Sequence, residues 1–324
     1  MYHDFIFSIE ATFPVFLVMV IGYFLHKFGF MTEEFCKASD KLVFKVTLPI
    51  MLMKGLVEVD LVHDFDGKYV LFCAVVTIVG ILTIWGLTKT FMKDKSSIAE
   101  FVQASYRSSA AILGSTFILN IYGTTCMTSL MIIGSVPLFN IFAVLLLTLE
   151  TGEEEHKTKE EQREYLKKKL KGAMLGILKN PIIDGIVLGI VLSLLPIKYP
   201  VILTKTCANI AGLTSPLALL SIGATFQGKK AIAKIKPTIL ASFIKLVVLV
   251  AVFLPIATAL GFRDEKLVAL IIMLGSPTTA TSYIMSKNMG HEGVLSSSCI
   301  AVTTLFSSIT ITLWIFIFRS LGYL

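Results

Sequence analysis

Two apolar segments of this 324-residue chain carry polar side chains near their middles, where a membrane-spanning helix is normally apolar. In the segment 266–288, Pro277 lacks an N–H group and displaces the carbonyl of Met273 from the helical ladder. Its polar or flexible neighbours are Gly275, Ser276, Thr278, Thr279, Thr281 and Ser282. In hydrocarbon, a freed backbone group is tolerated only against protein or a water-filled cavity. This segment therefore predicts a helix that is interrupted at a central binding cavity.

The segment 98–121 has a similar polar interior but no proline. If both helices are interrupted and run in opposite directions, the N-terminal ends of their second halves point at one place. Such ends favour an anion, for example a carboxylate. The predicted substrate-binding residues are Arg107, Ser108, Ser109, Gly114, Asn120, Gly275, Ser276, Pro277, Thr278, Thr279 and Thr281.

Each of these polar residues also has a purely structural interpretation. A Ser or Thr in a membrane helix often bonds to its own backbone or lets two helices pack closely. Arg107 either snorkels to the cytoplasmic side or contacts an anion, and Lys245 is expected to snorkel. The functional interpretation depends on the clustering of the polar residues around two related positions.

Asp184 lies inside a hydrophobic run, three residues after Pro181. An acid at membrane depth could be a coupling site for a proton or a cation, or could pair with Arg107 or Lys245. A hydrated position near the membrane surface is the alternative, because Asp184 is close to the cytoplasmic end of its predicted span.

An internal repeat relates the two halves of the chain by 167 residues. Pro14 matches Pro181, Gly22 matches Gly189, Pro49 matches Pro216, and Gly123 matches Gly290. A constant register of this kind is typical of transporters built from two repeats. In this register Ala110 occupies the place of Pro277, so the interruption of the segment 98–121 is the less strongly marked of the two.

Apolar runs near 20 residues in length recur along the whole chain, as in a polytopic all-α membrane protein. Ten spans are predicted, at 9–28, 34–56, 68–91, 98–121, 127–149, 174–195, 200–226, 235–260, 266–288 and 294–319. Residues 1–150 and 173–324 would each form a five-helix repeat, joined by a charged cytoplasmic linker at 151–172. Because five is odd, the second repeat would be inverted relative to the first.

Most of the 29 Lys and Arg residues lie near the connections that follow odd-numbered spans, which makes those connections cytoplasmic and places both termini outside. The net charge of +7 then reflects topology and contact with anionic lipid, and gives no support for nucleic-acid binding. The five cysteines are scattered without a CxxC pair, and no metal or other cofactor is expected.

Three sequence runs resemble the auxin efflux carrier family of bacterial transporters, which is related to the plant PIN carriers and includes permeases for malate and malonate. The runs are NPIIDGIVLGIVLSLLP (180–196), SPLALLSIGATF (215–226) and SPTTATSYIMSKNMGHEG (276–293), the last followed by a Thr-rich span that ends ITLWIFIF. The segment YRSSAAILGSTF departs from the family pattern, since Ser109 takes the place of an Asn and Thr116 that of a Pro.

The resemblance implies two inverted five-helix repeats with broken crossover helices 4 and 9. Spans 1, 2, 6 and 7 would form a scaffold, and spans 3–5 and 8–10 a transport domain that moves like an elevator. Substrate would bind where spans 4 and 9 cross. Plant relatives are homodimers, so a homodimer is expected. The resemblance leaves open whether protons, sodium or the membrane potential drives transport.

The sequence thus predicts a secondary carrier for a small organic anion, such as malate, malonate or an auxin-like acid, in the cytoplasmic membrane. A sodium-coupled symporter of the bile-acid type is the nearest alternative. A membrane receptor or structural protein and a membrane-embedded enzyme are the alternatives of other classes. The enzyme is disfavoured because all five histidines fall at termini, span ends or loops. No Walker motif is present, which disfavours ATP-driven transport.

Overall fold

The computed structural model describes residues 14, 17–57, 65–110, 118, 126–150, 171–172, 174–176, 178–195, 197, 199–226 and 228–324. This part of the chain is helical and contains no strand. The first half contributes a helix at Leu17–Lys27, α2 (Glu33–Leu42), the π-helical turn η1 (Val43–Thr47), α3 (Leu48–Val57), α4 (Gly67–Phe91), the short η2 (Lys95–Ser97), α5 (Ile98–Tyr106) and α7 (Cys126–Leu149).

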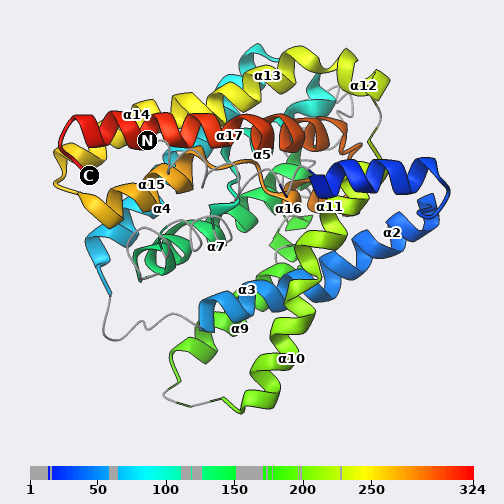
Figure 1. The fold of residues 1–324 in the computed structure, drawn as a ribbon, viewed down its shortest axis with the longest axis horizontal. Helices are drawn as coiled ribbons and strands as arrows, with labels where there is room; N and C mark the ends of the chain where they lie inside the picture. Colours follow the sequence, from blue (N-terminus) through cyan, green and yellow to red (C-terminus); the bar gives the residue numbers. More distant parts are fainter. Residues whose placement is uncertain are drawn as a thin grey trace.

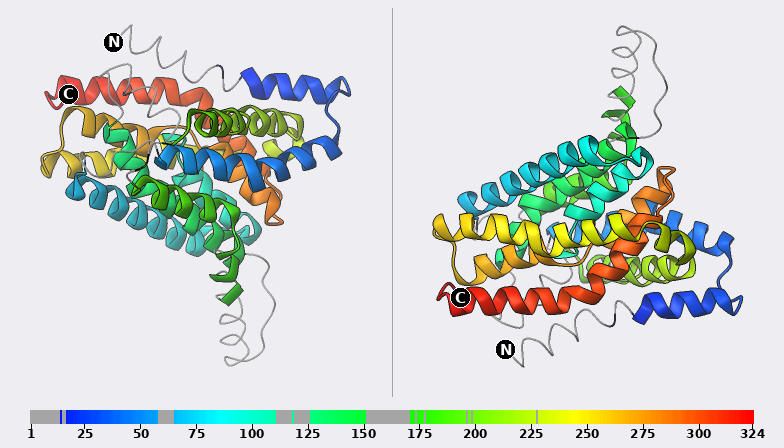
Figure 2. Two further views of the ribbon diagram at one scale, coloured as in Figure 1. Left: turned by 90° about the horizontal axis from the view of Figure 1, so that it is seen from below. Right: turned by 90° about the horizontal axis from the view of Figure 1, so that it is seen from above.

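The second half begins with α9 (Pro181–Ser193), α10 (Val201–Gly212), α11 (Thr214–Ala224) and the short α12 (Gly228–Ala233). It continues with α13 (Ile235–Phe243), the π-helical turn η3 (Ile244–Val248), α14 (Leu249–Ala259), α15 (Asp264–Gly275), α16 (Ala280–Asn288) and α17 (Val294–Ser320). Most of these helices run along the long direction of the molecule (Figure 2).

Five continuous helical stretches in the described residues are long and apolar enough to cross a membrane. They are Gly67–Phe91, Leu130–Leu149, Val201–Ala224, Ile235–Ala259 and Val294–Ser320. The pair α15 and α16 passes the same test as one span that is bent by 41°. The prediction of a polytopic helical membrane protein is thereby confirmed, whereas the count of ten spans stays a prediction.

Large apolar side chains on α4 face outward instead of into the protein. Leu71, Val75, Val79 and Leu82 are each between 45% and 64% exposed. Their spacing of three or four residues places them along one face of the helix. In water such a stripe would be unfavourable, so it indicates a face that contacts lipid.

The described helices form two groups (Figure 1). One group contains the Leu17–Lys27 helix, α2, α3, α9, α10 and α11. In this group α3 packs against both α9 and α10, while α11 packs against α2. The other contains α4, α5, α7 and α13 to α17. We call the first group the glycine-packed group, because its helices approach one another at glycines.

Two of these close approaches repeat the same contact in both halves of the chain. A Cβ atom placed on Gly22 would stand 2.3 Å from the carbonyl oxygen of Leu220, and one on Gly189 would stand 2.9 Å from the Cα of Met53. Only glycine permits such close helix packing. Gly22 precedes Gly189 by 167 residues, and Met53 precedes Leu220 by the same interval.

The second group is held together at both ends of its helices. At one end, the Glu100 carboxylate of α5 accepts hydrogen bonds from the backbone N–H groups of Gly293 (2.8 Å) and Ser296 (3.0 Å) at the start of α17. At the other end, Lys266 Nζ lies 2.5 Å from Asp66 Oδ2 beside α4. This hydrogen bond from Lys266 lowers the pKa of Asp66. These contacts make the second group a connected unit.

We expect Gly22→Ala to destabilise the protein by about 1–3 kcal/mol, because the added methyl overlaps the Leu220 backbone. The matched control is Gly86→Ala in α4, where no atom lies within 4 Å of the added Cβ. Helix propensity makes that control neutral or slightly stabilising. Thermal unfolding in detergent measures both changes, and equal melting temperatures for the two variants would contradict the packing argument.

Candidate substrate site at two interrupted helices

The helix predicted across 266–288 is interrupted around Pro277. The first piece, α15, ends at Gly275, and Ser276 is extended with φ −73° and ψ 161°. Thr279 is also extended, with φ −73° and ψ 144°, and α16 begins at Ala280. The interruption that proline dictates therefore spans four residues and is confirmed.

The segment predicted at 98–121 is interrupted as well, although it lacks a proline. Its first piece, α5, ends at Tyr106, and Arg107 is extended with φ −65° and ψ 139°. The predicted site residues Gly114 and Asn120 lie outside the described residues. The cause of this interruption lies in the contacts with the other segment.

Backbone groups link the two interrupted segments directly. The N–H of Ser109 donates to the carbonyl of Pro277 over 2.9 Å. The Thr278 hydroxyl donates to the carbonyl of Ala104 over 2.7 Å, and Thr278 is buried. The two interruptions leave backbone N–H and C=O groups without partners in their own helices. Groups of the other segment pair with them, as burial in hydrocarbon requires.

A serine from each segment completes this junction. The Ser108 hydroxyl lies 3.3 Å from the carbonyl of Ile272 and is hydrogen-bonded to the Ser276 hydroxyl. Both serines are buried, and 168 residues separate them in the sequence, one more than the repeat register. We call Arg107–Ser109 and Ser276–Thr279, with these contacts, the junction.

Arg107 is buried among protein side chains at the junction. Its side chain is 2% exposed, so the snorkelling alternative is wrong. One terminal nitrogen donates to Asn140 Oδ1 (3.0 Å) and to Thr281 Oγ1 (2.8 Å). The other lies 3.3 Å from Gln103 Oε1 and 2.9 Å from Met285 Sδ. Every described partner is neutral, and Nε has no partner among the described residues.

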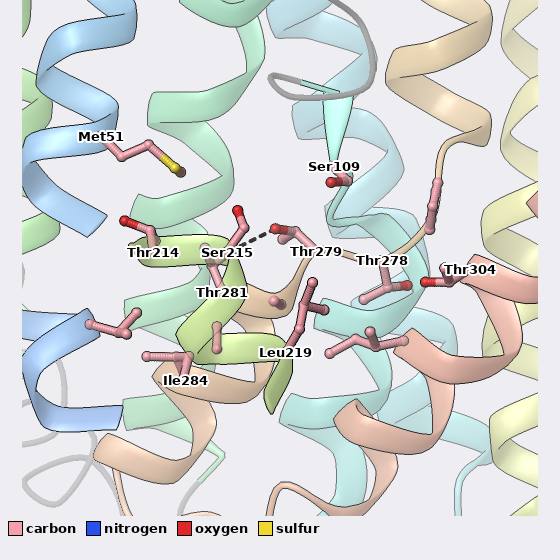
Figure 3. A pocket seen from close by; sticks show the side chains of 15 residues that line it. Met51, Ser109, Thr214, Ser215, Leu219, Thr278, Thr279, Thr281, Ile284 and Thr304 are labelled. Carbon is pink, nitrogen blue, oxygen red and sulfur yellow. Dashed lines mark hydrogen bonds between the residues drawn. The ribbon is translucent and has the colours of Figure 1, made fainter. Parts of the chain in front are cut away.

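A cavity of about 80 Å³ adjoins the junction. The two interrupted segments contribute Ser109, Pro277, Thr279 and Thr281 to its lining, and α11 contributes Thr214, Ser215 and Leu219. Figure 3 shows Thr214 and Ser215 of α11 close to Thr279 and Thr281. A second cavity, of about 40 Å³, is lined by Arg107, Ser109, Asn140, Thr279 and Thr281. Of the nine predicted site residues that the structure describes, Gly275 and Ser276 line neither cavity, and the other seven line one or both. These seven therefore border a small space between the two groups of helices, in which hydroxyl groups and Arg107 lie among apolar side chains.

Asn140 and Gln103 are site residues that the sequence reasoning missed. Asn140 is buried on α7, and its amide nitrogen donates to the carbonyl of Val136, which directs its oxygen at Arg107. Gln103 is fully buried one turn before Arg107. For Asn140 the available signal was an amide within a mainly apolar span, and for Gln103 it was the spacing of four residues before Arg107.

Asp184 lies apart from the junction. It is exposed in the first turn of α9, and among the described contacts it pairs with neither Arg107 nor Lys245. Its exposed place fits the hydrated interpretation, and a coupling role stays a prediction. The carboxylates that are buried in the described part belong to Asp40 and Glu100.

Lys245 is also buried, which contradicts the expected snorkelling. Its side chain is 0% exposed, on the π-helical turn η3. Nζ donates to the carbonyls of Leu274 (2.6 Å) and Met273 (3.2 Å) at the end of α15. The cation therefore lies against the interrupted helix.

Interrupted helices that meet beside a cavity within an apolar helical bundle indicate a membrane transport protein as the class of this chain. A family model described as "Membrane transport protein" matches residues 7–315. The chain belongs to this family, the auxin efflux carrier family.

Its relatives include transporters from enteric bacteria. The chain is 22% identical over 321 residues to the uncharacterized transporter YfdV of Escherichia coli strain K12, with 97% of this chain and 98% of the relative covered. The YfdV proteins of Escherichia coli O157:H7 and Shigella flexneri match to the same extent. The family and these relatives together indicate a multi-pass membrane transporter.

We expect Thr278→Val, which keeps the side-chain shape, to destabilise the protein by about 1–2 kcal/mol, because it leaves the Ala104 carbonyl without its donor. Thr310→Val is the matched control, since the exposed Thr310 hydroxyl bonds only within its own helix. Thermal unfolding in detergent compares the two. If Thr310→Val loses as much stability as Thr278→Val, the hydrogen bond from Thr278 to Ala104 does not contribute to the stability of the fold.

Proposed function

We propose that this protein is a secondary carrier for a small organic anion, a carboxylate such as malate, malonate or an auxin-like acid, in the cytoplasmic membrane. One observation carries the proposal. Arg107 is buried at the junction, its described partners are all neutral, and it lines a small cavity. An unpaired guanidinium at membrane depth costs several kcal/mol, which an anionic substrate would offset.

The chemistry of Arg107 favours a carboxylate over a neutral ligand. A guanidinium presents its N–H groups as a planar fork that matches two carboxylate oxygens. Its Nε has no partner among the described residues, and the amide and hydroxyl oxygens of Asn140 and Thr281 hold the rest of the group in place. Neutral oxygens can orient the cation and leave its charge available to a substrate.

The size and lining of the cavities favour a small anion over the bile-acid-type alternative. Volumes of about 80 and 40 Å³ are far below the roughly 300–1,000 Å³ of sites for drug-sized ligands. The 80 Å³ cavity beside the junction is lined by hydroxyl and apolar side chains, with no carboxylate among its described lining residues. A sodium site would want carboxylate, amide or freed carbonyl oxygens.

The cavity lining also disfavours a membrane-embedded enzyme. No His, Cys, Asp or Glu lines the 80 Å³ cavity beside the junction among the described residues. Hydrolysis or acyl transfer would require a nucleophile with an adjacent base. A receptor would not need two interrupted helices that share their released backbone groups, so transport is the better explanation of this arrangement.

For the architecture we propose two inverted five-helix repeats, residues 1–150 and 173–324, with the linker 151–172 in the cytoplasm and both termini outside. Two observations support this. The Gly22–Leu220 contact recurs as Gly189–Met53 at a shift of 167 residues. In addition, Ser108 and Ser276, which are 168 residues apart, bond to each other at the junction.

For the mechanism we propose alternating access of the elevator type. Spans 1, 2, 6 and 7 correspond to the glycine-packed group and would be the scaffold, while the other group would carry the site as transport domain. The cavity between the two groups supports this division, since sliding of one group would expose it to either side. A homodimer through the scaffold is proposed from the family resemblance.

We expect Arg107→Gln to weaken the binding of malate or malonate by about 10- to 100-fold, because a hydrogen bond to a charged group contributes about 1.5–3 kcal/mol. A thermal-shift titration of purified protein measures the affinity. Arg263→Gln, at a helix end remote from the junction, is the control for a lost surface charge. Unchanged affinity in Arg107→Gln would contradict a substrate role for Arg107.

We expect Pro277→Ala to reduce malonate uptake into proteoliposomes by at least about 10-fold while the amount of folded protein stays near that of the wild type. An N–H at position 277 lets the helix re-form and closes the substrate cavity. Pro255→Ala, inside the continuous helix α14, is the matched control and should transport normally. Wild-type flux in Pro277→Ala would exclude the interruption from the transport site.

A further inference from the structure

Lys245 is the most completely buried cation in the described part of the chain. Its position is related to the helix interruption that follows α15. The π-helical turn η3 that carries it lies between α13 and α14 and packs against α15, α17 and α5. Its side chain is 0% exposed. The ammonium lies at the C-terminal end of α15, within hydrogen-bond distance of two carbonyl oxygens.

Both carbonyls have lost their donors within the helix. In a continuous helix, the carbonyl of Met273 would accept from residue 277, which is Pro277 and has no N–H. The carbonyl of Leu274 would accept from Thr278, whose N–H instead donates to Thr303 Oγ1 over 3.0 Å. Lys245 Nζ supplies the donor for both, at 3.2 and 2.6 Å.

No acid neutralises this ammonium among the described residues. The buried charged side chains there are Asp40, Glu100, Arg107 and Lys245. Glu100 accepts from two backbone N–H groups of α17, and Arg107 bonds to neutral groups. Asp40 lies on α2, in the other group of helices. Lys245 therefore faces only the partial negative charge of the end of α15.

Two freed carbonyls at the C-terminal end of a half-helix are the kind of ligands that hold a coupling sodium ion in carriers with interrupted helices. We propose that the Lys245 ammonium is a built-in substitute for such an ion. It neutralises the carbonyl end of α15, so the adjoining junction accepts an anion without binding sodium. The consequence for substrate rests on the proposed function, whereas the cation site itself does not.

The first test needs no substrate. Lys245→Ala leaves a space that matches n-propylammonium, the part of the side chain beyond Cβ. We expect n-propylammonium chloride to raise the melting temperature of Lys245→Ala by at least about 3 °C relative to choline chloride at equal ionic strength.

Two proteins are the controls for this titration. Lys245→Met fills the same space with an uncharged side chain, and the wild type already holds its own ammonium. Neither should respond to n-propylammonium beyond the choline baseline. An equal response in Lys245→Met or the wild type, or no response to n-propylammonium in Lys245→Ala, would overturn the proposal.

If Lys245→Ala does not fold, cells that express it are grown with n-propylammonium, and the recovery of folded protein is compared with that of Lys245→Met. Recovery that depends on the amine in the alanine variant alone supports the proposal. Amine dependence in neither variant or in both overturns it.

The second test addresses substrate. Wild-type malonate binding should be unchanged when choline replaces sodium, whereas Lys245→Gln, which keeps a donor but lacks the charge, should bind malonate at least about 10-fold more weakly. Sodium-dependent binding by the wild type, or wild-type affinity in Lys245→Gln, would overturn the proposal. A wild-type protein that binds no organic anion would contradict the proposed function, and the melting-temperature test would still decide the role of Lys245.

Discussion

The structure depends on one constraint, which is that a backbone group released from a helix in hydrocarbon must find another partner inside the protein. Pro277 makes the constraint unavoidable, because it removes a donor from the middle of a span. The partners come from separate elements. Ser109 donates to the carbonyl of Pro277, Thr303 accepts from Thr278, and Lys245 donates to the end of α15. The interruption thereby fixes how spans distant in sequence pack together.

The same constraint explains why the polar residues gather in one place. A helix interruption needs donors and acceptors, and each additional interruption at another depth would need its own set. Two interrupted segments that satisfy each other share one set, as the pairing of Ser108 with Ser276 shows. The resulting junction is polar, buried and next to a cavity, which are the properties that a substrate site needs. The residues that pair the released backbone groups are therefore also the ones that we propose for substrate recognition.

The interruption at Pro277 could be predicted from the sequence because its cause is local. The interruption after Tyr106 could be foreseen only through the repeat register, since no residue there breaks a helix by itself and its partner lies in the other half of the chain. The burial of Arg107 and Lys245 could not be predicted, because a long cationic side chain in a span fits either snorkelling or burial. Asn140 was missed because its amide marks one polar position in an apolar span but does not show that it faces Arg107 from another helix.

The two buried cations differ in what they leave available, and this difference separates their roles. The Lys245 ammonium has both carbonyl acceptors within 3.2 Å, at a helix end whose partial negative charge it balances. Arg107 is held by neutral amide, hydroxyl and thioether groups, and its Nε has no partner among the described residues. Neutral partners orient a guanidinium without cancelling its charge. The charge of Lys245 is thus largely balanced within the protein, whereas the charge of Arg107 stays available for the anionic substrate that we propose.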